Sequence, residues 1–206
     1  MTQPALEAAE ARIGAAGAKL GMWLFLFTEL LFFGGMFLLY AVYRGRYAAG
    51  FHAAAAEENT YVGAFNTALL LTSSLAMALA VAALRRGRRH LSLLLQGATI
   101  LMGAGFLAIK SVEWAAKIGR GLYPDSTVLL ARSHGEVLFF GLYYVMTGIH
   151  GLHVLIGICL IGVTLGLTAR GRLSAEQPTL LENTGLFWHF VDVVWIYLFP
   201  LFYLVT

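Results

Sequence analysis

Long apolar stretches alternate with short polar segments along the whole chain. Five of these stretches reach the roughly 20 residues of helix that a hydrocarbon core of about 30 Å requires. None shows the alternation of polar and apolar residues over about 10 positions that is typical of membrane barrel strands. The stretches run approximately Gly21–Tyr43, Tyr61–Leu84, Leu91–Ala116, Val137–Thr168 and Leu186–Val205. Because hydrocarbon offers no partner to an exposed amide, the pattern predicts an all-α integral membrane protein, a bundle of five transmembrane helices.

The polar connections between the stretches are short. The first, from Arg44 to Thr60, is rich in alanine and is predicted to hold a short surface helix. Glycine and proline in the segment Gly119–Asp125 predict a turn there. We therefore expect a single transmembrane domain over residues 21–206, preceded by a cytoplasmic segment over residues 1–20. That segment is not expected to be a cleavable signal, because it carries acids and the apolar run after it is too long.

Composition restricts the class of protein further. Apolar side chains make up 59% of the 206 residues and charged ones 12%, against roughly 25% charged residues in average globular chains. Such apolar content rules out intrinsic disorder. The formal net charge of +3 reflects few carboxylates, without the basic face that would indicate nucleic-acid binding. Cys159 is the single cysteine in the sequence, so the chain has no intrachain disulfide.

The distribution of lysine and arginine predicts the orientation of the bundle. Cytoplasmic connections of membrane proteins carry an excess of these residues. Eight of them lie in the N-terminal segment and in the second and fourth connections, against five in the first and third. Four of the eight belong to the short run Arg85–His90. This bias places the N-terminus inside and the C-terminus outside.

Glu29 lies within the first apolar stretch, where a charge near the bilayer centre costs roughly 2.5–3.5 kcal/mol. No basic residue lies within four positions of it on the same helix. Glu29 is therefore expected either to be protonated or to pair across the bundle. It is interpreted either as a carboxyl that exchanges protons or contacts lipid, or as a buried neutral acid bonded to another helix.

In the third stretch, Lys110 and Glu113 lie three positions apart on one helical face. This spacing predicts a local ion pair near the outer boundary of the membrane. The long side chain of Lys110 is expected to extend outward to the interface.

The fourth stretch contains His150 and His153, also three positions apart on one face. Gly148 and Gly151 flank His150, and with Gly157 they are predicted to allow another helix to approach closely. Two histidines on one face make half of a metal site. The sequence has one more intramembrane histidine and no second Glu-x-x-His motif, so interhelical hydrogen bonding is preferred. We predict no catalytic, metal-binding or cofactor-binding residue in this chain.

The fifth stretch contains His189 and Asp192, again on a shared face. They can orient each other or bind across to the histidines of the fourth stretch. Trp188 and Trp195 are expected to pack between helices or to contact lipid. Because polar residues recur in four of the five stretches, we expect them to share one bundle interior.

Several segments match, in order, motifs of one known family. They are Phe25–Phe33 with Glu29, Asn66–Ser74, Ser111–Trp114 with Glu113, and the two specific strings Thr147–Val154 and Trp188–Ile196. From Leu20 to Tyr203 the chain resembles subunit III of the haem–copper oxidases, the cytochrome c oxidase subunit III family. Longer members have seven spans. The five spans here resemble the shorter bacterial form, which lacks the two leading helices that border a lipid-filled cleft.

The resemblance implies a multi-pass protein of a bacterial inner membrane that contacts the catalytic subunit I and subunit II. It implies no haem or copper in this chain, because those groups belong to the partner subunits, which reduce oxygen to water and pump protons. The chain would stabilise the catalytic subunit, support proton uptake and retain phospholipid. Membership of a larger respiratory supercomplex stays open.

Two alternatives remain at this point. One is a similar partner of a quinol oxidase or a nitric oxide reductase. The other is an independent proton-coupled transporter that would use Glu29, Asp192 and the histidines, although the sequence shows no inverted repeat.

Overall fold

The computed structural model describes residues 3–205, with side chains from residue 13 onward, and these residues form helices without any strand. The helices are α1 (Gln3–Arg46), α2 (Ala48–Ala55), α3 (Thr60–Arg85), α4 (Arg89–Gly119), α5 (Thr127–Leu130), α6 (His134–Ala169) and α7 (Thr179–Tyr203). In this part of the chain five helices are long and apolar enough to cross a membrane, namely α1, α3, α4, α6 and α7. The predicted all-α architecture with five candidate spans is confirmed.

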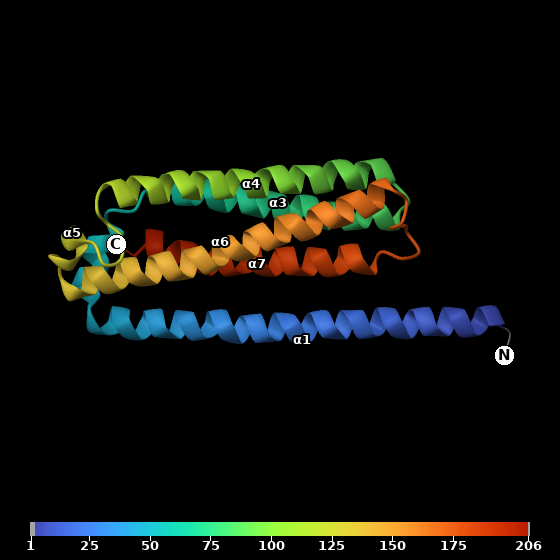
Figure 1. Ribbon diagram of the computed structural model, residues 1–206, viewed down its shortest axis with the longest axis horizontal. Helices are drawn as coiled ribbons and strands as arrows, with labels where there is room; N and C mark the ends of the chain where they lie inside the picture. The colour runs from blue at the N-terminus through green and yellow to red at the C-terminus, as the bar shows by residue number, and fades with distance from the viewer. Residues whose placement is uncertain (1–2, 206) are drawn as a thin grey trace.

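Four of the long helices form the centre of the bundle. Helices α3 and α4, α4 and α6, α6 and α7, and α7 and α3 pack against one another in turn. Helix α1 lies along one side of this group and contacts α6 and α7 (Figure 1). It buries Leu26, Phe33 and Tyr40, which recur every seven residues along one face, and exposes most of its other side chains.

Helix α1 is longer than the first predicted span. It runs without a break from Gln3 through residue 20, so the backbone shows no boundary between a leading segment and the span. The first two residues and the side chains up to residue 12 lie outside the described part of the chain. The cytoplasmic segment over residues 1–20 therefore stays a prediction.

Three glycines allow the chain to reverse direction after long helices. Gly87, Gly121 and Gly171 follow α3, α4 and α6, and each has a φ near +70°, which side-chain-bearing residues rarely adopt. In each case the residue after the glycine donates its N–H to a carbonyl five positions earlier, as Leu122 does to Lys117. This pattern satisfies helix-end carbonyls and keeps the connections short.

The predicted short helix in the first connection is present as α2, but it is not a surface helix. Its residues Phe51, Ala54 and Ala55 are buried, and the helix packs on α6. Gly50 and Gly135 make this possible, because a Cβ at Gly50 would lie 2.7 Å from the Cα of Gly135. Because neither glycine has a side chain, the backbones of α2 and α6 come into direct contact here, and α2 packs into the core.

Trp188 occupies the centre of the bundle between α4 and α6. A Cβ at Gly103 or at Gly157 would lie 2.7 Å from its ring, and its indole N–H donates to the Ser73 hydroxyl at 3.0 Å. The indole of Trp195 likewise donates to Thr67 at 3.0 Å. Both tryptophans are buried, so they pack against protein and satisfy their one donor there.

Candidate functional site

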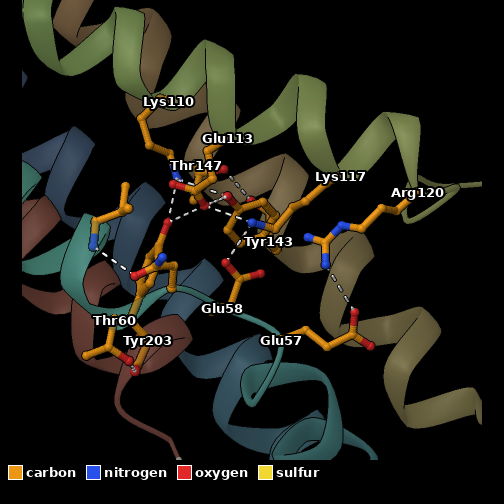
Figure 2. Close-up of polar contacts among 12 residues, drawn as sticks. Glu57, Glu58, Thr60, Lys110, Glu113, Lys117, Arg120, Tyr143, Thr147 and Tyr203 are labelled. Atoms are coloured by element: carbon orange, nitrogen blue, oxygen red, sulfur yellow. Dashed lines mark hydrogen bonds and ion pairs between the residues drawn. The ribbon is translucent and has the colours of Figure 1, made fainter.

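A buried ionic network lies at the end of the bundle where α4 ends and α6 begins (Figure 2). We call it the Glu113 network. Its members come from the α2–α3 connection, α4, α6 and α7, and are Glu58, Lys110, Glu113, Lys117, Tyr143 and Tyr203.

Glu113 is the centre of this network. Its Oε1 accepts hydrogen bonds from the Tyr203 hydroxyl at 2.6 Å and from the Lys117 ammonium at 2.9 Å. The Tyr143 hydroxyl also donates to this oxygen, and Lys110 Nζ lies 3.3 Å from both carboxylate oxygens. Four donors around one carboxylate stabilise its ionised form.

Lys110 makes the predicted ion pair with Glu113, but the expected outward extension of its side chain is wrong. The residue is only 7% exposed. Its Nζ lies 2.7 Å from the Tyr203 hydroxyl and 2.9 Å from that of Tyr143. The ring centroids of both tyrosines and of Trp195 lie 4.9–5.3 Å from the ammonium nitrogen, so aromatic faces stabilise the charge inside the bundle.

Glu58 and Lys117 are members of the network that the sequence analysis did not single out. Lys117 Nζ lies 2.7 Å from Glu58 Oε2, and both side chains are buried. Burial raises the pKa of Glu58 to about 7, and the positive charge of Lys117 only partly offsets it. The spacing of Lys117 four positions after Glu113 was a usable signal. Glu58 lies in a connection, where sequence spacing carries no information about its partner.

Glu29 pairs across the bundle, one of the two outcomes expected for it. Its Oε2 lies 3.1 Å from Nε2 of His153, and Phe33 packs against the edge of the imidazole. The other ring nitrogen of His153 is 2.9 Å from the carbonyl of Ile149, which can only accept, so that nitrogen carries a proton. A hydrogen bond between Nε2 and Glu29 then needs one further proton, held by either partner. A single shared proton therefore joins the two side chains.

His150 does not join His153. Residues three positions apart on a helix differ by about 60° in direction, which is enough for different neighbours. His150 is fully buried, with Nε2 3.2 Å from the carbonyl of Val191 and its ring beside Trp195. In the part of the chain that the structure describes, no three His, Cys, Asp or Glu side chains are placed to hold a metal ion.

His189 and Asp192 do not orient each other, nor do they bind across to the histidines of α6. Nδ1 of His189 lies 2.6 Å from the hydroxyl of Ser74. Asp192 is 3% exposed, and neither of its carboxyl oxygens meets a hydrogen-bond partner among the described side chains. Helix α3, rather than α6, lies opposite His189.

The glycines of α6 take different neighbours. A Cβ at Gly148 would lie 3.0 Å from the ring of Trp114, and one at Gly151 would lie 3.8 Å from Leu107. Both contacts are to α4, so this face of α6 does approach another helix closely. The intramembrane acids and histidines are buried or half-buried, yet they form separate groups rather than one connected interior.

The sequence of this chain was compared with those of known proteins, and the matches point to one family. The sequence matches the family described as cytochrome c oxidase subunit III over residues 3–206. It is 35% identical to cytochrome c oxidase subunit 3 of Thermostichus vulcanus, covering 91% of this chain and 87% of that one. It is 32% identical to cytochrome bo(3) ubiquinol oxidase subunit 3 of Pseudomonas aeruginosa, covering 89% and 83%. It is 30% identical to a haem–copper oxidase subunit I+III of Aeropyrum pernix, covering 89% of this chain and 22% of the relative.

Proposed function

Because the chain belongs to the cytochrome c oxidase subunit III family, we propose that it is the non-catalytic third subunit of a respiratory cytochrome c oxidase. The family match over nearly the whole chain carries this proposal. The whole-chain match favours a subunit of an oxidase complex over an independent transporter. In the proposed complex the haem and copper groups reside in partner subunits, and this chain contributes structure, proton handling and lipid contacts.

Glu29 and His153 are the residues we propose for proton handling. They form a half-buried pair that needs one shared proton, at membrane depth on the side of the bundle where α1 meets α6. The pair is neutral overall only while it holds this proton, so loss of the proton would leave an unpaired carboxylate in an apolar environment and would favour its prompt return. Glu29 thereby fits a role in supporting proton uptake by the catalytic subunit.

The catalytic subunit I is the proposed main contact, with subunit II as a second partner. The relative from Aeropyrum pernix is described as subunit I+III, which supports a direct contact between the corresponding chains. Helix α1 exposes most of its apolar side chains, so it has surface left for partner helices or for bound phospholipid.

We propose that the protein is a multi-pass subunit of a bacterial inner membrane, with the N-terminus inside. An odd number of spans puts the two chain ends on opposite sides, in agreement with Figure 1. Of the five cations counted for the outer side, Lys117 is buried in the Glu113 network. Inner cations are paired as well, since Lys19 and Arg85 contact Glu182, so the orientation still rests on the bias counted from the sequence.

Purification of the native complex tests the proposal. A tag on this chain, used in mild detergent, is expected to retrieve a large haem-containing subunit, visible by its optical spectrum and identified by mass spectrometry. The retrieved complex should consume oxygen, whereas this chain alone should not. Retrieval of intact chain without haem or a large partner would overturn the assignment.

A second candidate is the third subunit of a quinol oxidase. The relatives from Pseudomonas aeruginosa and Bacillus subtilis, described as ubiquinol and quinol oxidase subunits, are 32% and 33% identical to this chain. Electron-donor choice resides mainly in other subunits. Oxygen consumption by the purified complex with reduced cytochrome c, compared with a quinol, separates the two candidates.

A further inference from the structure

Glu58 is the carboxylate of the Glu113 network whose oxygens lack hydrogen-bond donors. Its side chain is 0% exposed, and Oε2 pairs with Lys117 at 2.7 Å. Neither oxygen has a hydrogen bond of normal geometry among the described residues, so Oε2 contacts Lys117 only as an ion pair. Glu113 differs, because four donors surround its Oε1. An added proton therefore finds free lone pairs on Glu58, whereas Oε1 of Glu113 is surrounded by donors and its Oε2 is contacted by Lys110 at 3.3 Å.

The charges around Glu58 balance only when it is ionised. Two lysines and two glutamates make up the charged part of the network, so their formal charges cancel. The groups that face Glu58 are Lys110, Glu113 and Lys117 from α4, Tyr143 and Tyr144 from α6, and Tyr203 from α7. Its neighbour Glu57 is directed elsewhere, to Arg120 and Arg132. Protonation of Glu58 would give the network a net charge of +1.

A pocket leads to this network from outside. It has a volume of about 450 Å³, lies between α3 and α4, and is lined by Glu113 and Lys117 among others. Arg120 and Glu57 also line it, with side chains that are 52% and 27% exposed. Figure 2 shows these two residues facing each other beside the network. Water that enters the pocket reaches Lys117, whose Nζ lies 2.7 Å from Oε2 of Glu58.

We propose that Glu58 is a proton-binding site at this end of the bundle, filled from water through the pocket between α3 and α4. In the binding step one O–H bond forms between a proton from water and Oε1, no electron moves, and the charge of the network rises by one unit. Glu58 lies outside the five candidate spans, and burial brings its pKa to about 7, within reach of ordinary changes in pH. Burial opposes the charged form, so loss of the proton favours exposure of the α2–α3 connection.

Infrared spectroscopy of the complete purified complex tests this site. The C=O band of a protonated carboxylic acid should appear as the pH falls, with a midpoint near 7, and should be absent in Glu58→Gln. Labelling glutamate with carbon-13 should shift the band, which separates it from Asp192. Glu57→Gln is the matched control and should leave the band unchanged, because Glu57 is partly exposed and bonded to arginines.

A band that persists in Glu58→Gln, or that Glu29→Gln removes instead, would overturn the proposal. If Glu58→Gln does not assemble, Lys117→Gln gives a second measurement. Loss of this cation should raise the midpoint by at least about one pH unit, and an unchanged midpoint would also overturn the proposal. Neither readout uses haem or oxygen consumption, so failure here leaves the third-subunit proposal untouched.

Discussion

The replacement Gly157→Ala tests whether Trp188 is held between two helices as described. The added Cβ would lie 2.7 Å from Cε3 and 2.9 Å from Cζ3 of the indole. The ring has little room to move away, because Gly103 on α4 lies so close that a Cβ there would be 2.7 Å from Cη2 of the indole, and the indole N–H is bonded to Ser73. The clash must therefore be relieved by movement of α6 or α7.

The expected cost follows from these distances. Non-bonded carbons prefer about 3.5–4.0 Å, so the overlap is about 1 Å. Overpacking of this kind costs about 1–3 kcal/mol. Alanine also gains about 1 kcal/mol over glycine in helix propensity. Gly162→Ala is the matched control, because no described atom lies within 4 Å of a Cβ there and the gain in propensity is the same. The two variants should differ by about 1–3 kcal/mol.

Thermal and denaturant unfolding of the purified complex, followed by tryptophan fluorescence, measures this difference. Gly157→Ala should unfold at lower temperature than the wild-type chain, whereas Gly162→Ala should not. Adding Trp188→Phe to Gly157→Ala should recover part of the loss, since the smaller ring leaves room for the methyl group. Equal stability of the two alanine variants would refute the described packing of Trp188.

Three further predictions concern the ionisable groups. Glu29→Gln should leave the complex assembled at wild-type yield, because the amide N–H of glutamine can still donate to Nε2 of His153. Loss of the large partner from the purified complex would show that Glu29 is structural. Lys110→Met should destabilise the fold by about 3–5 kcal/mol by leaving Glu113 short of a buried cation, and adding Glu113→Gln should recover much of this in denaturant unfolding. The fold raises the pKa of Glu58 from 4.5 to about 7, so the contribution of Glu58 to the free energy of unfolding should be largest below pH 4.5 and should fall by about 3 kcal/mol as the pH rises to 7. The variant Glu58→Gln should lack this part of the pH dependence. A pH profile of stability that is the same in the variant and the wild type would contradict the described burial.

The spans could be predicted closely because hydropathy is a local property. The second stretch was expected over residues 61–84 and the helix covers Thr60–Arg85; the third was expected over 91–116 and the helix covers Arg89–Gly119. Most ends extend further than predicted because polar residues continue a helix beyond the hydrocarbon, whereas α7 ends at Tyr203, two residues before the predicted Val205. Helix α5 was not predicted, since four residues are too few for a periodic pattern.

The candidate sites were predicted only in part. Spacing of three positions placed Lys110 beside Glu113, which the structure confirms, because both belong to one helix. The same argument did not find Glu58, which reaches Lys117 from a connection 59 positions away in the sequence. It also paired His189 with Asp192, although the nearest polar partner of His189 belongs to another helix.

The sequence alone determined that this protein is a helical membrane protein with five candidate spans, since a bilayer imposes its length and polarity on every segment separately. Its motifs also indicated the family. Only the tertiary structure decided which ionisable groups meet. Glu29 and His153 are 124 positions apart, and the donors around Glu113 come from α4, α6 and α7. Spacing along one helix fixes a direction around its axis, whereas the neighbour in that direction depends on how all the helices pack together.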